Sequence, residues 1–200
     1  TMKTYKVNEC FYSLQGEGVR AGTANVFIRF TGCNMRCDLA ETLLSPGGFS
    51  CDTEFASGRK LTLDELWRQC LDVVEIALNK PVAEFWPEPW FILTGGEPAL
   101  QADDNFCRYF HERGAKLAIE TNGSLPVSKL INWVTVSPKV AEHAIKQLTA
   151  DEVRYVRGYG QGIPKPVCQS QYKLISPAFD GDRLDERTLQ WCMKLVRENP

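Results

Sequence analysis

Short apolar segments alternate with Gly- or Pro-rich turns and amphipathic segments along this chain, and this order constrains its fold the most. Strands are predicted over residues 5–11, 25–30, 90–93, 116–120, 133–136, 152–156 and 171–175. Helices are predicted over residues 103–113 and 185–198. A third helix is predicted to begin at a capping box formed by Thr62 and Glu65. A repeated strand–loop–helix order favours a parallel sheet wrapped by helices.

The length of the chain limits how far such a sheet can close. A complete eight-stranded barrel needs about 250 residues, and this chain has 200. We therefore expect an α/β fold, an incomplete TIM-like barrel of about six mainly parallel strands, in a single domain over residues 1–200. In such folds ligands bind at the carboxyl ends of the strands.

Composition and charge exclude several classes of protein. The chain is 44% hydrophobic and 10% aromatic, which is enough for a folded core. Its 23 basic and 25 acidic residues give a net charge of −2, which argues against a protein that coats nucleic acid. No apolar run approaches about 20 residues, so no membrane span is expected. The first residues lack an apolar signal segment, so a cytoplasmic protein is expected.

Three of the eight cysteines stand apart from the rest. Cys33, Cys37 and Cys51 fall in one Gly-flanked loop after a predicted strand, with the spacing C-x3-C-x13-C. A closed structural zinc site needs four ligands, whereas three thiolates suit a four-iron cluster with one open iron. A zinc site of three thiolates and water remains an alternative. Cys70, Cys107 and Cys192 lie on apolar helix stripes and are predicted to be buried structural residues. Cys10, at the end of a strand, and Cys168, in a Pro/Gly-rich loop, are predicted to be structural or incidental.

Polar and Gly-rich motifs follow three predicted strands. These motifs are Thr94-Gly95-Gly96-Glu97-Pro98, Glu120-Thr121-Asn122-Gly123 and Ser137-Pro138-Lys139. The first would let a ligand approach the backbone, but it lacks the ending of a phosphate-binding P-loop. The second offers a carboxylate and an amide for ribose hydroxyls, and the third a hydroxyl and an amine. Taken singly, each is also compatible with an ordinary turn.

Two features near the N-terminus suggest contacts to a ligand. Gln15 and Glu17, in a Gln-Gly-Glu-Gly turn, could pair with the polar edges of a heterocycle. Arg29 stands in an otherwise apolar strand, where a charge needs a partner. A carboxylate or phosphate ligand would suit its planar fork, and an internal salt bridge is the alternative.

Together these motifs resemble the radical S-adenosylmethionine superfamily, and within it the lyases of the queuosine pathway. The resemblance runs from Tyr5 to about Trp191 and is carried by the segments 14–18, 51–53, 120–126 and 136–139. It implies a [4Fe-4S] cluster, S-adenosylmethionine and Mg²⁺. It also implies conversion of 6-carboxy-5,6,7,8-tetrahydropterin to 7-carboxy-7-deazaguanine with loss of ammonia, a homodimer, and an electron donor such as flavodoxin.

The resemblance also assigns roles to residues of this sequence. The implied cluster ligands are Cys33, Cys37 and Cys51, and the implied magnesium ligand is Thr53. The implied substrate contacts are Leu14, Gln15, Gly16, Arg29 and Thr94. The implied S-adenosylmethionine contacts are Gly96, Glu120, Ser137, Pro138, Lys139 and Ser176.

The sequence departs from the pattern of these lyases in three places. The usual cysteine spacing is C-x3-C-x2-C, and here an insertion of residues 38–50 separates Cys37 from Cys51. Ser176-Pro177 stands where relatives often have Gln-Pro, and relatives carry one more strand after the last helix. Two other functions stay open: a radical enzyme on another small substrate, such as an activase that makes glycyl radicals, or a zinc- or redox-binding module.

Overall fold

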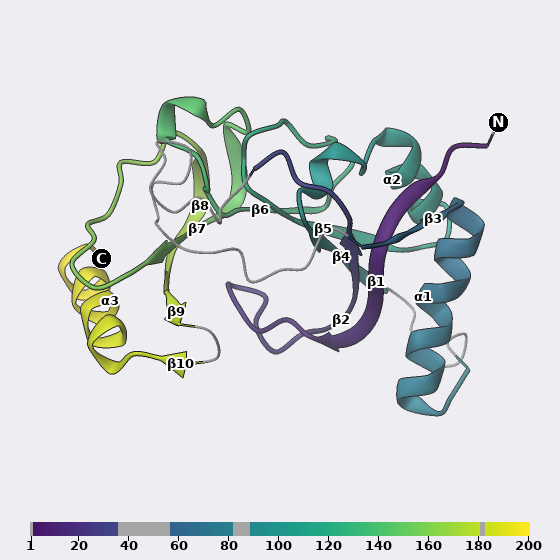
Figure 1. The fold of residues 1–200 in the computed structure, drawn as a ribbon, viewed down its shortest axis with the longest axis horizontal. Coiled ribbons are helices and arrows are strands. Elements are labelled where there is room, and N and C mark those ends of the chain that lie inside the picture. Colours follow the sequence, from purple (N-terminus) through teal and green to yellow (C-terminus); the bar gives the residue numbers. More distant parts are fainter. Residues whose placement is uncertain (1, 36–56, 82–88, 181–182) are drawn as a thin grey trace. The chain divides into compact units, whose positions relative to one another are not determined.

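The repeated strand–loop–helix order produces a mostly parallel sheet with flanking helices. The computed structural model describes residues 2–35, 57–81, 89–180 and 183–200 (Figure 1). Its contacts divide the chain into two units. The first unit comprises Thr1–Asn34, Thr53–Thr121 and Pro126–Val134; the second comprises Met35–Asp52, Asn122–Leu125 and Thr135–Pro200.

The first unit contains five strands in the order β3-β1-β2-β4-β5 along its sheet, counting described residues. They are β1 (Tyr5–Leu14), β2 (Ala24–Phe30), β3 (Arg59–Leu61), β4 (Trp90–Gly95) and β5 (Lys116–Thr121). Strand β1 runs antiparallel to β2 and β3, while β2, β4 and β5 are parallel. The helices of this unit are α1 (Leu63–Leu78), α2 (Asp104–His111) and the short η2 (Pro98–Leu100).

The second unit contains the parallel strands β7 and β8, and β6, parallel to β7, crosses its boundary. Their bounds are β6 (Trp133–Val136), β7 (Thr149–Arg157) and β8 (Gln169–Pro177). The small strands β9 (Phe179–Asp180) and β10 (Arg183–Leu184), the short helix η3 (Glu142–Ala144) and helix α3 (Glu186–Glu198) complete the unit.

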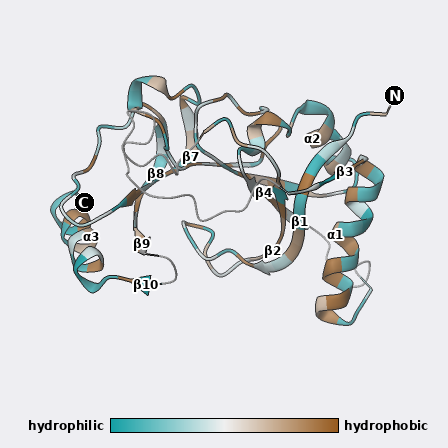
Figure 2. Ribbon diagram, viewed as in Figure 1, coloured by the Kyte–Doolittle hydropathy of each residue, from teal (hydrophilic) through white to brown (hydrophobic). Residues whose placement is uncertain are grey.

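Alternate strand residues and two helix stripes form the core of the first unit. Ile28 and Phe91 on the sheet pack in one cluster with Leu66 of α1 and Phe110 of α2. The Phe91 and Phe110 rings meet edge to face with centroids 5.0 Å apart. Figure 2 shows hydrophobic and hydrophilic residues alternating along α1, as in an amphipathic helix. Burial of one helix stripe therefore holds α1 and α2 on the sheet.

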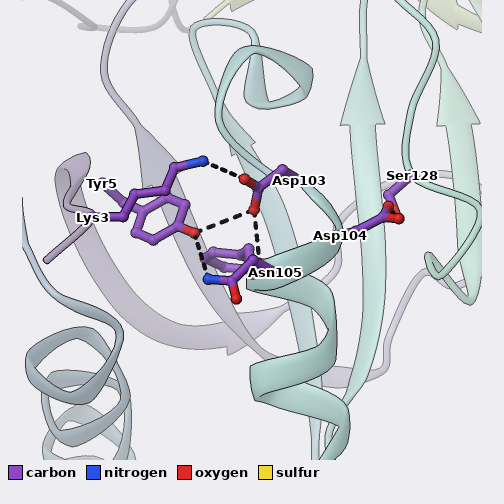
Figure 3. A network of polar contacts seen from close by, with 7 residues as sticks. Lys3, Tyr5, Asp103, Asp104, Asn105 and Ser128 are labelled. Atoms are coloured by element: carbon purple, nitrogen blue, oxygen red, sulfur yellow. Dashed lines mark hydrogen bonds and ion pairs between the residues drawn. The ribbon is translucent and has the colours of Figure 1, made fainter.

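Local hydrogen bonds set where the helices begin. The predicted capping box of α1 is present, since the Thr62 backbone N–H donates to Glu65 Oε2 at 2.8 Å. Asp103 is the N-cap of α2 and accepts from the Phe106 backbone N–H at 2.9 Å. Asp103 also accepts from Lys3 and, at 3.2 Å, from the Tyr5 hydroxyl (Figure 3). The start of the chain is thus tied to the start of α2.

The fold class predicted from the sequence is confirmed. Six of the described strands, β2 and β4 to β8, are parallel to a neighbour, and the sheet is not closed into a barrel. Cys70, Cys107 and Cys192 are buried as predicted, and Cys10 and Cys168 are buried as well. The edge strand β3 was not predicted, because Arg59, Lys60 and Leu61 carry no strand pattern. No helix among the described residues is both long and apolar enough to span a membrane.

Candidate functional site

Four predicted ligand contacts lie on the sheet face of the first unit that does not pack on α1 and α2. Arg29 is in register with Thr94, and two residues earlier Phe27 is in register with Ile92 and Ile92 with Ala118. Side chains alternate between faces along a strand. Glu120, two residues after Ala118, therefore belongs to the same face as Arg29 and Thr94, and Gln15, after the end of β1, reaches this face through its hydrogen bond to Glu120.

Gln15 and Glu120 contact each other directly. The Gln15 Nε2 donates to Glu120 Oε1 at 2.9 Å, although 105 positions separate the two residues in the chain. Gln15 is held by the hairpin between β1 and β2, since its N–H donates to Thr23 O and its carbonyl accepts from Gly22 N, both at 2.8 Å. On either side of Gln15, Leu14 and Gly16 are exposed. The bond joins a predicted substrate contact to a predicted cosubstrate contact.

Arg29 has a carboxylate partner that the sequence did not indicate. Its Nε donates to Glu9 Oε1 at 2.8 Å, and Glu9 lies directly opposite on β1. The guanidinium also lies over the Phe11 ring, 5.6 Å from its centroid. The Arg29 side chain is 24% exposed, so it is not sealed in the core. The internal salt bridge considered from the sequence is therefore present, and Arg29 remains accessible to a ligand.

Gly95, the last residue of β4, and Gly96, which follows it, bring the start of the cysteine loop close to β4. A Cβ on Gly96 would lie 2.1 Å from Gly32 O, and one on Gly95 would lie 2.3 Å from Phe30 O. The Gly96 N–H donates to Phe30 O at 3.1 Å, and the Glu97 N–H to Gly32 O at 2.9 Å. The sequence predicted that these glycines expose backbone to a ligand; in the structure their close approach is to residues 30–33, next to Cys33.

Cys33 differs from the other described cysteines in its surroundings. It lies just after β2 and is partly exposed, whereas the other five are buried. Burial raises the pKa of the Cys107 thiol to about 11, and likewise that of Cys168. Such thiols stay protonated at neutral pH, and the thiolate is the metal-binding form. Position and exposure thus suit Cys33, and not Cys107, to metal binding.

Glu97 is a buried carboxylate that the sequence analysis left without a role. It is fully buried, and its Oε1 accepts from the Ala99 N–H at 2.9 Å and from the Thr121 hydroxyl at 2.7 Å. Glu97 caps the short helix η2, whose first residue is Pro98. A proline directly after an acceptor residue is a helix-start signal, which could have identified this cap.

The end of the Glu-Thr-Asn-Gly motif is used within the second unit. The Asn122 Oδ1 accepts from the Ser124 N–H at 2.9 Å, which is a local turn. The Gly123 carbonyl accepts from Lys146 N and Gln147 N at 2.8 and 3.1 Å. A Cβ on Gly123 would lie 2.9 Å from Val136 Cγ1. In this part of the motif, the turn interpretation describes the structure.

The remaining predicted cosubstrate contacts lie in the second unit. Ser137, Pro138 and Lys139 directly follow β6, and Ser176 lies near the end of β8; all four are partly buried. Strand β7 of the same unit holds a buried ion pair that the sequence analysis missed. Arg154 Nη1 lies 3.2 Å from Glu152 Oε1, which also accepts from the Thr135 hydroxyl at 3.2 Å.

Several predicted residues are not placed or not grouped by the structure. Cys37, Cys51 and Thr53 lie outside the described residues. Within the described ranges, no three His, Cys, Asp or Glu side chains form a group that could hold a metal ion. A surface pocket of about 530 Å³ in the second unit contains none of the predicted site residues. It is lined by Tyr159, Glu186, Arg187, Gln190, Trp191 and Lys194.

Known proteins resemble this chain in sequence and in fold. No family model matches it. The 7-carboxy-7-deazaguanine synthase of Nitratidesulfovibrio vulgaris is 36% identical over 201 residues, covering 95% of this chain and 91% of the relative. The 7-carboxy-7-deazaguanine synthase of Burkholderia multivorans is 35% identical, covering 96% of this chain and 91% of the relative. That of Bacteroides thetaiotaomicron is 42% identical over 134 residues, covering 67% of this chain and 60% of the relative.

A solved structure shows the same fold. The crystal structure of QueE from Escherichia coli superimposes with a TM-score of 0.62 over 98% of this chain and 91% of that chain, at 20% sequence identity. This likeness bears on the fold alone. The sequence similarity to the relatives from Nitratidesulfovibrio vulgaris and Burkholderia multivorans extends over nearly the whole chain.

Proposed function

The chain belongs to the 7-carboxy-7-deazaguanine synthase family, and from this premise we propose that it is a radical S-adenosylmethionine lyase. The proposed reaction converts 6-carboxy-5,6,7,8-tetrahydropterin to 7-carboxy-7-deazaguanine with loss of ammonia, in 7-deazapurine and queuosine biosynthesis. One structural observation carries most weight. Gln15, Arg29, Thr94 and Glu120, which come from four strands or their ends, share one sheet face, and Gln15 and Glu120 are hydrogen-bonded.

The proposed cluster ligands are Cys33, Cys37 and Cys51. The fit is supported at Cys33, a partly exposed thiol at the carboxyl end of β2, where ligands of parallel sheets collect. When bound, a [4Fe-4S] cluster with an open iron would supply the electron that cleaves S-adenosylmethionine to methionine and a 5′-deoxyadenosyl radical. The protein's own part is to hold the reactants and to exclude water.

The proposed substrate contacts are Leu14, Gln15, Gly16, Arg29 and Thr94. Arg29 would bind the carboxylate of the pterin, because a guanidinium recognises that group through paired hydrogen bonds. The Gln15 amide would meet the polar edge of the heterocycle. Thr53 is proposed as a magnesium ligand, since hydroxyl oxygen is among the hard ligands that Mg²⁺ prefers.

The proposed cosubstrate contacts are Gly96, Glu120, Ser137, Pro138, Lys139 and Ser176. Gly96 and Glu120 belong to the first unit, and Glu120 would bind ribose hydroxyls through its carboxylate. The contacts from the second unit are Ser137, Pro138, Lys139 and Ser176. A lysine amine and a serine hydroxyl suit the carboxylate of the methionine part of the cosubstrate.

We also propose a cytoplasmic homodimer that receives electrons from a flavodoxin-like protein. Sedimentation of the reconstituted protein tests the dimer. A monomer at micromolar concentration would contradict it.

Anaerobic turnover tests the function as a whole. The reconstituted protein is incubated with S-adenosylmethionine, dithionite, Mg²⁺ and the tetrahydropterin, and products are identified by mass. We expect 7-carboxy-7-deazaguanine from the wild type and none from Cys33→Ala. A colourless protein that binds zinc would support the alternative of a zinc module. Cleavage of the cosubstrate without this product would support another small substrate.

A further inference from the structure

The direction of the Gln15 side-chain amide is fixed from both ends. Its Nε2 donates to the Glu120 carboxylate at 2.9 Å, and its Oε1 accepts from the Glu17 backbone N–H at 3.3 Å. An ionised carboxylate can only accept and a backbone N–H can only donate. If the amide were reversed, Gln15 Oε1 would face the Glu120 carboxylate oxygen, and the Gln15 NH₂ group would face the Glu17 backbone N–H. The two partners therefore agree on one orientation, and Glu120 supplies the stronger, charge-assisted contact.

This arrangement leaves a defined hydrogen-bonding capacity on Gln15. A primary amide has two N–H donors and two acceptor lone pairs. The contacts to Glu120 and Glu17 use one donor and one lone pair, counting the described part of the chain. One N–H and one lone pair remain on a partly exposed side chain whose backbone is held on both sides by the hairpin. The amide therefore presents a donor and an acceptor in fixed places.

We propose that Glu120 is a positioning residue that selects the substrate heterocycle by fixing the direction of the Gln15 amide. This inference rests on the proposed function, and it gives Glu120 a role beyond the cosubstrate contact. A pyrimidinone ring has an N–H beside a carbonyl, whereas a 2,4-diaminopyrimidine has a ring nitrogen beside an amino group. The two rings present opposite donor and acceptor patterns, so an amide fixed in one direction matches one of them.

The test compares the affinities of two ligands for reconstituted protein under anaerobic conditions, with S-adenosylmethionine withheld. The ligands are 6-carboxytetrahydropterin and its 2,4-diamino analogue, and their Kd values are measured by calorimetry. We expect the wild type to prefer the pterin by about tenfold or more, because the wrong pattern leaves hydrogen-bonding groups unpaired. In Glu120→Gln the new amide can donate or accept, so the Gln15 amide can adopt either orientation. The ratio of the two Kd values should therefore fall toward one.

A double-mutant cycle distinguishes positioning from a direct contact. Gln15→Met removes the amide that would contact the heterocycle, with little change in side-chain size. The preference for the pterin should then fall as it does in Glu120→Gln. Adding Glu120→Gln to Gln15→Met should change the preference no further, because Glu120 acts through Gln15. A further loss of selectivity in the double variant would overturn the inference.

Glu152→Gln is the control for general loss of stability. It weakens a buried ion pair in the second unit, so it should lower Tm and leave the ratio of Kd values as in the wild type. A changed ratio in this control, or an unchanged ratio in Glu120→Gln, would overturn the inference while the proposed function stands. A wild type that binds neither ligand would contradict the proposed function itself.

Discussion

At the scale of single residues, cluster assembly should depend on which cysteine is removed. Cys33→Ala removes a partly exposed proposed ligand, so bound iron and the absorbance near 400 nm should fall to background. Cys107→Ala is the matched control, because Cys107 is buried in α2 with its thiol pKa raised to about 11 by burial. It should lower stability by about 1 kcal/mol or more and retain iron. A brown Cys33→Ala protein would exclude Cys33 as a ligand.

Arg29 offers a second test at this scale, because its salt bridge and its proposed ligand role can be separated. Arg29→Ala should raise the substrate KM at least about tenfold with iron content unchanged, since it removes the carboxylate contact. Glu9→Gln removes the partner of the salt bridge and keeps the guanidinium. Because the pair is partly exposed, that change should cost less than about 1 kcal/mol.

The two variants together decide the role of Arg29. KM and Tm are measured on both, and Arg29→Lys should recover part of the affinity, because a lysine keeps the charge without the planar fork. Equal effects of Arg29→Ala and Glu9→Gln on Tm, with KM unchanged in both, would reduce Arg29 to a structural residue.

At the scale of elements, the start of α2 should make stability depend on acid pH. Burial tends to raise the pKa of Asp103, but hydrogen bonds from Lys3, the Phe106 backbone and Tyr5 outweigh it and leave that pKa lowered. A folded-state pKa below the unfolded value of about 3.9 means that Asp103 stabilises the protein above that pH. The contribution is lost as pH falls through the folded pKa.

Asp103→Asn is the variant that reveals this dependence, because asparagine also caps helices but carries no charge. Denaturant unfolding of wild type and variant at several pH values should show the largest difference in stability near pH 7. The difference should shrink as pH falls below about 4. A difference that is constant across this range would show that the Asp103 charge contributes nothing.

The sequence predicts elements better than it predicts which strand residues face each other. The capping box of α1 and the apolar stripes around Cys70 and Cys107 depend on neighbours a few positions away, and they are confirmed. The partner of Arg29 depends on register. The pairing of β1 with β2 shifts between Val7 and Glu9, and beyond this irregularity Glu9 lies opposite Arg29. No local pattern shows where such a shift occurs.

The same limit applies to the candidate site. The sequence identified Gln15 and Glu120 as ligand contacts, but a hydrogen bond across 105 positions follows only from the strand order. The tight approach of Gly96 to Gly32 is likewise a consequence of β2 and β4 being adjacent parallel strands. The sequence identified Gly96 as a position where the backbone can be approached closely, but it did not show that the approaching backbone is that of Gly32.

The buried pair in β7 gives a further prediction for an element. The side chains of Glu152 and Arg154 are only 2% and 7% exposed. Removing one charge therefore leaves the other buried without its ionic partner. Arg154→Met should therefore cost about 3–5 kcal/mol. Adding Glu152→Leu to that variant should recover much of the loss, because no buried charge is then left. Denaturant unfolding measures both, and additive losses would show that the two charges are not coupled.

At the scale of the whole molecule, binding of the proposed cosubstrate should stabilise the folded chain. A ligand at 100 times its Kd adds about 2.7 kcal/mol. For a chain of this length each kcal/mol raises Tm by about 2–4 °C. The reconstituted wild type should therefore gain about 5–10 °C in Tm with saturating S-adenosylmethionine. Cys33→Ala should gain nothing, because the open iron is the proposed anchor of the cosubstrate.

Lys139→Ala uses the same Tm measurement to test a proposed cosubstrate contact in the second unit. Lys139 is partly buried directly after β6, where its amine is proposed to meet the cosubstrate carboxylate, so the gain in Tm should shrink markedly. Lys146→Ala removes an exposed lysine of the same unit and should keep the full gain. Equal gains in the two lysine variants would remove Lys139 from the site. A wild type whose Tm does not respond would contradict cosubstrate binding altogether, since a ligand that binds the folded state must stabilise it.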